Sequence, residues 1–525
     1  MIIKTQTNNF QKKIIVSLLI IFAISLSVRL YLLPFEIPFK TDAIDYFSFA
    51  FEISKSQKFP IGILHTNDGW SLFLSPIFSL IGNSDMMTLI NAQRITSIFI
   101  SSLTIIPVYF LCKKFASPKI SLIGASLFGF NYKLIENSIL GITEPLFIFL
   151  ITLMIIFTLD KNKKLFLLSF IFLGLSSIVR YESLVFLIPL SIIFFIRFRK
   201  EKIFYTRYPI FILIFILILL PTAMFRMESN DTDGLISHTL DFITSPSTSY
   251  LTNLIDESKQ MEPDPARPST LEIFSNNLLY NTLKFLGLVS IPIFIFLIPI
   301  GLYRLYKTKN VNLAYLIIFS IFMIIPAMYA YGRDIQETKY LLILFPIFCT
   351  FSVYGLDMFK KLEQNKFILL LFLIILISSI LLLNYNQPNN VYYNEIYEVT
   401  KYVVKNASGV NTYPGNSFVK IVTLENNWPK SLPIGDDAKI TFNIKKIPSK
   451  NFTTLEEYIL HSEINDLSHI VLVEENNNSS FLDDLFYNYK KYPYLEKVFD
   501  SSNKNFTNKI IILEINYPIF EKMSL

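Results

Sequence analysis

The chain has 525 residues, of which 52% are hydrophobic and only 17% charged, and its mean hydropathy is +0.46. Soluble globular chains carry about a quarter charged residues, so this composition indicates a polytopic membrane protein. Two Cys and four His exclude a disulfide scaffold and a cysteine-based zinc site. The sequence has neither a P-loop nor a Gly-x-Gly fingerprint. The net charge of +6 comes from basic residues between apolar runs, so nucleic acid is not an expected partner.

Eleven apolar runs alternate with short polar links, and they predict about eleven transmembrane helices. The runs cover residues 14–28, 95–112, 120–131, 142–159, 165–179, 183–196, 210–225, 285–303, 311–330, 340–356 and 367–383. Basic clusters precede the first run and recur in every second link after it. The positive-inside rule therefore places the N-terminus inside and the C-terminus outside. Arg29 follows the first run with no small-residue cleavage site, which favours a retained helix over a signal peptide.

The charge balance changes near residue 385, and this change divides the chain into two domains. After Asn384 the sequence has 14 Lys, no Arg and 17 acidic residues (net −3), whereas the preceding part has 33 basic and 24 acidic residues (net +9). We expect a membrane domain at 1–385, with outer loops at 34–88 and 226–282, and an extracytoplasmic α/β domain at 386–525. All six Asn-x-Ser/Thr sequons, at Asn230, Asn406, Asn451, Asn477, Asn478 and Asn505, fall in segments that this orientation puts outside.

The predicted C-terminal domain mixes helices and strands. Residues 392–405, 455–464 and 481–491 are expected to form helices, and residues 419–424, 470–473 and 509–515 strands. The domain has no Cys, so a packed core must hold it together. It carries no catalytic constellation that the sequence reveals, and His461 and His469 are expected to be ordinary surface or boundary residues.

The first outer loop contains a predicted amphipathic helix that begins at Asp42, with Asp45 in its first turn and Tyr46 following. Asp42 or Thr41 could simply cap this helix, or Asp42 could be a functional carboxylate. The stretch from Gly69 through Trp70 to Pro76 is expected to form an aromatic-rich turn at the membrane interface.

Three of the apolar runs hold only 12 to 15 residues and reach roughly 18–23 Å, short of the ~30 Å hydrocarbon core. Their outer ends carry Tyr132, Glu136, Arg180, Tyr181 and Glu182. Charged residues at such a depth are candidates for function. Simpler interpretations also exist, because Arg180 and Glu182 could neutralise each other.

Two further outer segments carry candidate residues. Thr143 and Glu144 could cap the next helix, where a glutamate suits the helix dipole. Arg333 and Lys339 lie in the outer turn between the ninth and tenth runs. The predicted outer face thus combines carboxylates with cations, which a phosphate-bearing lipid substrate would need.

Four short motifs resemble those of GT-C fold glycosyltransferases, which include the dolichyl-phosphate-mannose–protein mannosyltransferases and the lipid A aminoarabinose transferases. The first is Asp42-x-x-x-Tyr46-x-x-x-Ala50 after Arg29, where Ala43 replaces the usual Glu. The other three are Thr143-Glu144-Pro145-Leu146-Phe147, Arg180-Tyr181-Glu182-Ser183, and Lys339-Tyr340-Leu341-Leu342-Ile343-Leu344-Phe345-Pro346. The resemblance covers residues 14 to 385.

This resemblance implies a hexosyltransferase that moves a sugar from a polyprenyl (dolichyl) phosphate to an acceptor hydroxyl on the outer face, with inversion. Asp42 matches the catalytic base, and Asp45 and Glu144 are further catalytic candidates. Arg180, Glu182, Arg333, Lys339, Tyr46 and Trp70 are the candidates for binding the lipid phosphate and sugar. No cofactor is required, because a phosphate is already a good leaving group; a divalent metal, if one is bound, would take Asp42, Asp45 and Glu144.

The expected partners are the lipid-linked sugar, membrane lipids and an acceptor protein, lipid or glycan, and the expected location is the plasma membrane of a prokaryote. Two alternatives remain. A transporter or flippase of lipid-linked glycans would need ionisable residues within repeated, broken spans. An oligosaccharyltransferase shares the GT-C fold but carries a Trp-Trp-Asp motif, whereas this chain has only Trp70 and Trp428.

Overall fold

A computed structural model describes residues 2–40, 42–59, 67–82, 84–200, 202–230, 270–359, 364–386, 389–426, 428, 444–450, 452–463, 466–474, 479–504 and 506–524. Thr41, most of the predicted outer loop 226–282, and the sequons at Asn451, Asn477, Asn478 and Asn505 lie outside these residues. The chain divides into two compact units. Unit 1 comprises Met1–Leu33, Ile61–Ile77 and Ala92–Asn386, and unit 2 comprises Pro34–Pro60, Phe78–Asn91 and Gln387–Leu525.

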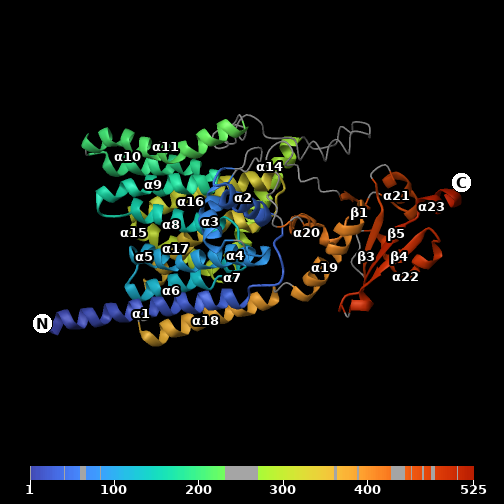
Figure 1. Ribbon diagram of the computed structural model, residues 1–525. Helices are drawn as coiled ribbons and strands as arrows, with labels where there is room; N and C mark the ends of the chain where they lie inside the picture. The colour runs from blue at the N-terminus through green and yellow to red at the C-terminus, as the bar shows by residue number, and fades with distance from the viewer. Residues whose placement is uncertain are drawn as a thin grey trace. The chain divides into compact units, whose positions relative to one another are not determined.

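Unit 1 is a helical body (Figure 1). Its α-helices are α1 (Ile2–Tyr31), α5 (Ile105–Lys113), α6 (Pro118–Gly129), α7 (Tyr132–Ile139), α8 (Glu144–Thr158), α9 (Phe166–Val179), α10 (Leu187–Phe198), α11 (Lys202–Asn230), α14 (Thr270–Ser290), α15 (Phe294–Thr308), α16 (Val311–Gly332), α17 (Phe345–Leu356) and α18 (Asn365–Tyr385). The short 3₁₀ helices η1 (Lys163–Leu165), η2 (Tyr181–Phe186) and η3 (Thr338–Leu344) precede α9, α10 and α17. The boundary between the units falls within α3 (Gly69–Ile81) and α4 (Met86–Leu103).

The eleven predicted apolar runs all fall on helices, but not all of these helices are long enough to span a bilayer. Within the described residues, seven helices are long and apolar enough to cross a membrane. The number rises to eight if α14 and α15, which meet at 97°, form one broken span. The helices α8 and α9 hold only 15 and 14 residues. The chain is therefore a polytopic helical protein with several short helices inside its body.

Close helix packing in unit 1 depends on small residues. A side-chain carbon at Gly301 of α15 would overlap the carbonyl oxygen of Phe351 on α17. A carbon at Gly355 of α17 would lie 2.8 Å from the backbone nitrogen of Gly301. The two backbones approach each other at a distance that only glycine permits, as is common in membrane helix pairs.

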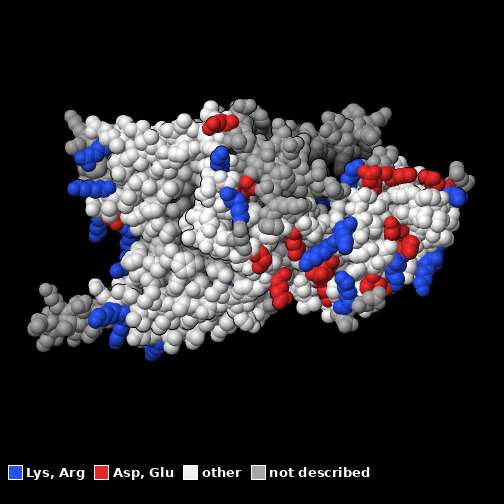
Figure 2. All heavy atoms as spheres, viewed as in Figure 1, with Lys and Arg blue, Asp and Glu red and all other residues white. Residues whose placement is uncertain are grey.

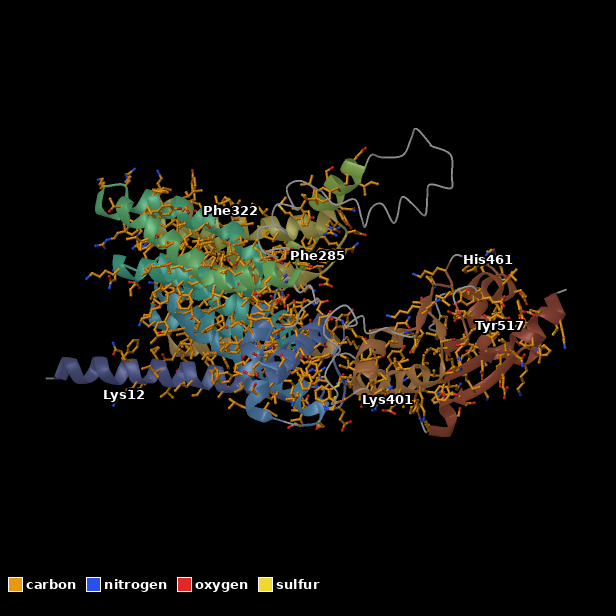
Figure 3. All side chains as sticks on the ribbon, turned by 45° about the horizontal axis from the view of Figure 1, so that its top comes forward. Lys12, Phe285, Phe322, Lys401, His461 and Tyr517 are labelled. Atoms are coloured by element: carbon orange, nitrogen blue, oxygen red, sulfur yellow. The ribbon has the colours of Figure 1, made fainter. Side chains whose placement is uncertain are left out.

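The outermost helices of unit 1 expose apolar side chains, as expected of helices that face lipid. Only Ile375, Ser379 and Leu383 of α18 are buried, and α1 and α11 also bury little of their length. On the face shown in Figure 2, Lys and Arg side chains gather at the end of the helical unit where α1 begins. The labelled Lys12 projects from this exposed first part of α1 (Figure 3).

Unit 2 joins part of the first predicted outer loop to the C-terminal residues. Its helices are α2 (Asp42–Ser56), α19 (Asn390–Asn406), α20 (Val419–Asn426), α21 (Leu455–Ser462), α22 (Ser480–Asn488) and α23 (Tyr517–Ser524). Further 3₁₀ turns are η5 (Pro414–Ser417), η8 (Tyr489–Lys491) and η9 (Ser501–Lys504). Its strands are β1 (Gly409–Asn411), β2 (Lys445–Ile447), β3 (His469–Val473), β4 (Leu495–Asp500) and β5 (Ile510–Ile515).

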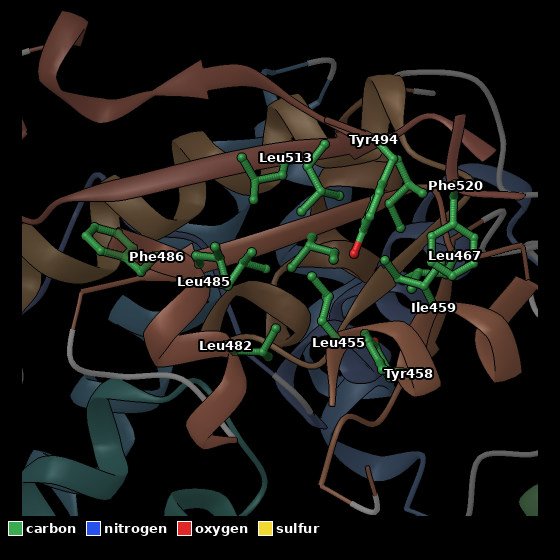
Figure 4. Close-up of a cluster of buried hydrophobic side chains, with 14 of the residues drawn as sticks. Leu455, Tyr458, Ile459, Leu467, Leu482, Leu485, Phe486, Tyr494, Leu513 and Phe520 are labelled. Carbon is green, nitrogen blue, oxygen red and sulfur yellow. The ribbon is translucent and has the colours of Figure 1, made fainter. Parts of the chain in front are cut away.

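The five strands form one mixed sheet in the order β2-β1-β3-β5-β4. β1 runs parallel to β2 and β3, whereas β5 is antiparallel to both β3 and β4. A core of leucines and aromatic residues lies between the sheet and α21, α22 and α23 (Figure 4). Tyr458 and Leu513 are fully buried in this core, which holds the domain together without cysteine.

Several local predictions from the sequence are confirmed and others are wrong. Helices at 42–56 and 390–406 and strands at 469–473 and 510–515 agree with the prediction. The expected turn at Gly69–Pro76 is instead the apolar helix α3, with Pro76 inside it. The expected strand at 419–424 is the helix α20. His461 is exposed on α21 (Figure 3), whereas His469 is buried, with its Nδ1 2.9 Å from the Ser468 hydroxyl.

Candidate active site

In unit 1, one pocket brings together four of the predicted site residues. Glu144 on α8, Arg180 before η2, Glu182 on η2 and Lys339 on η3 all line it, with Phe147, Ile148, Phe186, Met323, Pro326, Tyr340 and Ile343. The cavity among these residues is only about 20 Å³, room for about one water molecule, so a larger ligand would require the surrounding side chains to move. The mostly apolar walls and the few charged groups are typical of a ligand site.

Arg180 is the central charge of this pocket. Its backbone is extended (φ −146°, ψ 116°) where the chain leaves α9 and enters η2. Its Nη1 lies 2.5 Å from Oε1 of Glu144 and its Nη2 lies 2.8 Å from Oε1 of Glu182. The guanidinium also lies 5.8 Å from the ring centre of Phe147 and 5.6 Å from that of Tyr340. The two ion pairs are buried, because the side chains are 9%, 4% and 16% exposed for Arg180, Glu144 and Glu182.

The prediction that Glu144 opens a helix is correct, but the predicted cap does not form. Thr143 occupies the N-cap position of α8 without a capping hydrogen bond from its side chain. Its hydroxyl instead lies 3.4 Å from both Glu144 and Arg180. Thr143 and Glu144 therefore face the guanidinium, while Glu144 also lies in the first turn of α8, so its functional role stays a prediction.

Lys339 is the second cation of the pocket. Its Nζ lies 2.6 Å from Oε2 of Glu337 and 5.7 Å from the ring centre of Tyr340. Both cations thus carry ion pairs to carboxylates. A phosphate bound here would compete with Glu144, Glu182 and Glu337, and its binding would require these pairs to rearrange.

Arg333 and Trp70 do not line this pocket. Arg333 caps the end of α16 and lies 5.6 Å from the ring centre of Tyr329, and its Nε is buried with no hydrogen-bond partner among the described residues. Trp70 is fully buried, and its indole nitrogen donates a 2.9 Å hydrogen bond to the carbonyl of Gly141. Gly141 adopts a positive φ of 73°, so Trp70 fixes the turn that leads into α8.

The predicted carboxylates Asp42 and Asp45 belong to unit 2. Both lie in the first turn of α2, where Asp42 is exposed and Tyr46 is buried. Asp45 forms an ion pair with Lys420 of α20. Burial lowers the pKa of Lys420 and the charge of Asp42 opposes this shift, so Lys420 interacts with both carboxylates.

Sequence reasoning missed Lys420 and one buried ion pair. Lys420 comes from the tail, to which the sequence assigned no chemistry, and no local pattern marks it. In unit 1, Arg226 of α11 pairs with Asp68 through contacts of 2.6 and 2.7 Å, and the two side chains are 8% and 3% exposed. For this ion pair, the sequence offered one signal, which is the position of Asp68 directly before Gly69 and Trp70.

Three carboxylates were expected to be the ligands if a metal were bound. Asp45 is ion-paired with Lys420, and a cation next to a carboxylate disfavours the binding of a second cation there. Among the described residues, no group of three or more His, Cys, Asp or Glu side chains is arranged to hold a metal ion. Asp42 and Asp45 belong to one unit and Glu144 to the other, so we derive no step through a metal.

Comparisons with known proteins identify the fold. No protein-family model matches the chain, and no curated protein matches it in sequence. Among solved structures, the apo oligosaccharyltransferase of Archaeoglobus fulgidus aligns at 12% identity with a TM-score of 0.52, over 88% of this chain and 69% of its own. The chain has a GT-C fold.

Two further structures are similar to the chain. The same archaeal oligosaccharyltransferase, solved with an inhibitory peptide and a dolichol-phosphate, gives a TM-score of 0.50 at 12% identity over the same shares of the two chains. ArnT from Cupriavidus metallidurans in the apo state aligns at 8% identity with a TM-score of 0.46, over 98% of this chain and 99% of its own. At such identities the likeness concerns the GT-C fold alone.

Proposed function

We propose that this GT-C protein is a glycosyltransferase that moves a sugar from a polyprenyl-phosphate donor to an acceptor hydroxyl, with inversion, on the outer face of a prokaryotic plasma membrane. The observation that supports this most is the pocket in which Arg180 and Lys339 meet Glu144 and Glu182 within a GT-C fold. The same residues carry the sequence resemblance to enzymes of this type. The C-terminal domain lies outside in this proposal, as the charge pattern predicts.

Asp42 is the proposed general base. The acceptor oxygen attacks the anomeric carbon of the sugar while the bond from that carbon to the phosphate oxygen breaks. The phosphate leaves with the bonding electron pair, and the carboxylate of Asp42 takes the proton of the acceptor hydroxyl. One displacement inverts the anomeric centre, and the low pKa of the phosphate makes a general acid unnecessary.

The cations of unit 1 are the proposed binding groups for the departing phosphate. A guanidinium can bind phosphate through two parallel hydrogen bonds, and fixed cations stabilise the charge that develops on the leaving group. In the structure Arg180 is engaged by two carboxylates, so donor binding must displace at least one of them. Glu182 is the more exposed of the two, at 16% against 4% for Glu144, and we therefore assign the exchange to Glu182.

This assignment predicts opposite effects for two conservative substitutions. Glu182→Gln should lower the KM for donor, because it releases one arm of Arg180 for phosphate. Arg180→Lys should raise that KM, because an ammonium cannot reproduce the planar, two-pronged contact. If Glu182→Gln raises the KM as much as Arg180→Lys does, Glu182 contacts the sugar instead.

An oligosaccharyltransferase-like activity is the second candidate, because structures of that enzyme align with this chain with TM-scores of 0.50 to 0.52. The two candidates differ in acceptor. One archaeal structure was tethered to an acceptor peptide containing the Asn-Val-Thr sequon, so a sequon peptide is a direct probe. Transfer to the asparagine of such a peptide would select the second candidate, whereas transfer only to hydroxyl acceptors would select the first.

The experiment that tests the proposal is transfer from radiolabelled polyprenyl-phosphate sugars in membranes that contain the wild type, Asp42→Asn, Asp45→Asn or Asp85→Asn. Asp42→Asn keeps size and polarity but removes the base, and we expect a loss of transfer of at least about 100-fold. Asp85 caps α4 by accepting a 2.8 Å hydrogen bond from the Thr88 backbone. Asparagine caps equally well, so Asp85→Asn is a matched control.

The possible results separate the alternatives. Loss in Asp42→Asn alone supports Asp42 as the base, and loss in Asp45→Asn alone moves that role to Asp45. If both variants transfer like the control, neither carboxylate is the base and Asp42 is a helix cap. If no donor is used by the wild type while the protein moves lipid-linked glycan across vesicles, the transporter interpretation replaces the enzyme.

A further inference from the structure

The proposed reaction makes no use of a groove in the C-terminal domain. This groove runs between α21 and α23, and the turn that leads from η8 into β4 forms its floor. Its cavity holds about 460 Å³, within the range of about 300–1,000 Å³ that is typical of ligand sites. The pocket around Arg180 in unit 1 holds only about 20 Å³. The groove is therefore large enough to receive a small ligand without rearrangement.

Three aromatic rings line the floor and one wall of the groove. The ring centres of Tyr492 and Tyr494 lie 5.7 Å apart, and that of Tyr494 lies 5.0 Å from that of Phe520 on α23. Figure 4 shows Tyr494 and Phe520 side by side at one end of the hydrophobic core. Both are almost fully buried, at 4% and 2% exposed, whereas Tyr492 is partly exposed. Tyr492 is therefore the ring that a ligand can reach.

Apolar side chains on both walls add to this surface. Leu460 of α21 and Met523 of α23 line the groove and are 58% and 57% exposed. Single exposed apolar side chains are common on protein surfaces, but here two of them border one cavity. Together with Tyr492 and Pro493, they form an apolar surface that a ligand with nonpolar faces can cover.

Polar groups of both signs complete the groove. Glu456 and Glu457 of α21 and Lys491 of η8 line it, and among the described residues none of the three forms an ion pair. The phenol of Tyr494 donates a 3.3 Å hydrogen bond to Oε1 of Glu456. The backbone nitrogen and the hydroxyl of Thr453 each donate a 3.3 Å hydrogen bond to Oε2 of Glu457. These bonds orient both carboxylates and leave one oxygen of each for a ligand.

This combination of groups favours a neutral ligand that is rich in hydroxyl groups. Lys491 would repel a cation, and the two carboxylates would repel an anion. Charge pairs at exposed sites also contribute little to binding. A hydroxyl group, in contrast, donates to a carboxylate and accepts from an ammonium, so a sugar uses groups of both signs. The nonpolar C–H face of a sugar ring can cover the ring of Tyr492, which offers an apolar face and a polar tip.

We infer that this groove binds a neutral oligosaccharide. One sugar ring stacks on Tyr492, and its hydroxyl groups donate hydrogen bonds to Glu456 and Glu457. Lys491 donates a further hydrogen bond to the sugar. The inference goes beyond the proposed function and does not depend on it, because binding in this groove requires neither a lipid-linked donor nor turnover. It gives the C-terminal domain a ligand site of its own.

The test is a saturation-transfer NMR titration of defined oligomers with the full chain in nanodiscs. The probes are the linear tetrasaccharides of mannose, glucose, galactose and N-acetylglucosamine, with tetralysine and tetragalacturonate as charged counterparts. We expect at least one neutral probe to bind saturably with a Kd below about 10 mM. Its affinity should change little with salt concentration, because no ion pair forms.

Substitutions of tyrosine locate the site. Tyr492→Ala removes the proposed stacking ring and should weaken binding of the neutral probe about 5- to 10-fold. Tyr492→Phe keeps the ring and should weaken binding by less than about 3-fold. Tyr487→Ala is the matched control, because Tyr487 of α22 is 61% exposed but does not line the groove, and it should bind the probe like the wild type.

A substitution on α21 provides a second line of evidence that does not alter the core. Glu457 is exposed, and Glu457→Gln keeps the oxygen acceptor but removes its charge. A neutral hydrogen bond is about half as strong as a charge-assisted one, so the neutral probe should bind about 2- to 5-fold more weakly. Glu496→Gln is the control, because Glu496 of β4 is exposed and lies outside the groove.

Three results would overturn the inference. The first is a failure of all four neutral probes to bind. The second is a neutral probe that binds equally to the wild type, Tyr492→Ala and Glu457→Gln. The third is saturable binding of tetralysine that weakens steeply with salt, which would make the groove a cation site. If the wild type transfers no sugar but binds a neutral probe through Tyr492, the proposed function fails and this inference stands.

Discussion

Replacing Arg180 by methionine should destabilise the protein much more than neutralising either of its partners. Arg180→Met removes the guanidinium but leaves Glu144 and Glu182 as unpaired carboxylates, with side chains that are 4% and 16% exposed in the wild type. Breaking a buried pair in this way costs about 3–5 kcal/mol, because an uncompensated charge remains. Glu144→Gln should cost only about 1–2 kcal/mol, since Arg180 keeps its 2.8 Å pair with Glu182 and the amide oxygen can still accept a hydrogen bond.

The double variant Arg180→Met/Glu144→Gln tests the cause of this asymmetry. It removes one of the two buried charges that Arg180→Met leaves behind, that of Glu144, so it should be more stable than Arg180→Met alone by about 1–3 kcal/mol. The substitution Glu144→Gln would then be harmful in the wild-type background but helpful in the Arg180→Met background. Packing loss alone does not produce such a change of sign.

The buried cysteines supply the assay. Cys112 and Cys349 are inaccessible in the folded protein, so a thiol-reactive fluorophore reports unfolding during a temperature ramp in nanodiscs. Arg180→Met should lower the Tm by about 3–5 °C, and the double variant should recover part of this loss. If Arg180→Met melts with the wild type, or the double variant melts lower than both single variants, the buried-charge reasoning is refuted.

Three further predictions concern other parts of the fold. Burial raises the pKa of Asp68 to about 6, against the opposing charge of Arg226. A raised pKa means that protonated Asp68 stabilises the folded protein. This contribution is complete below about pH 4 and is lost as the pH rises to 6, by up to about 3 kcal/mol. The Tm should therefore fall between about pH 4 and 6 and level off above that range, and Asp68→Asn should flatten that dependence; an equal slope in both proteins would contradict the assignment. Gly301→Ala places a carbon against the Phe351 carbonyl and should lower the free energy of unfolding by about 1–3 kcal/mol, measured by the same thiol assay. Gly287→Ala, whose added carbon meets nothing within 4 Å, is its control. Burial alone would raise the pKa of Glu395, but hydrogen bonds from residues 507 and 508 outweigh it and lower the pKa. Ionised Glu395 therefore stabilises the folded protein near neutral pH, and this contribution is lost in acid. Glu395→Gln should increase hydrogen exchange in α19 at neutral pH, and no difference from wild type would refute this.

Apolar periodicity predicted the helical body well, whereas the number of spans, about eleven, stays a prediction. Every long apolar run became helical because a backbone in lipid must satisfy its own hydrogen bonds. The expected number of about eleven exceeds the seven or eight found among the described residues, in part because α8 and α9 are apolar yet short. Composition cannot distinguish a short buried helix from a span, since both are apolar on all sides.

Two segments were assigned the wrong local structure for identifiable reasons. Gly69 and Pro76 are turn signals, but Trp70, Leu74 and Phe78 recur at helical spacing and are all buried, and this pattern prevailed. Residues 419–424 are rich in β-branched side chains, which favour strands. They form α20 because its apolar side chains are buried by tertiary contacts, which override that preference.

The candidate site was partly predictable. Glu144, Arg180, Glu182 and Lys339 were chosen from motifs far apart in sequence, and the structure places all four around one pocket. Lys420 could not be predicted, because its partner Asp45 lies 375 residues away and nothing in its own neighbourhood marks it. Trp70 was selected for its interfacial character, and its buried hydrogen bond to Gly141 could only be seen in three dimensions.

Because so few residues of α18 are buried against the protein, lipid is expected to surround most of this helix. This helix has 21 residues and a length of about 31 Å, close to the hydrocarbon thickness of a typical membrane. Because few buried residues fix its angle, we expect this helix to change its tilt when the bilayer is thinner or thicker. Reconstitution in lipids of different chain length should therefore change the angle of α18 to the membrane normal.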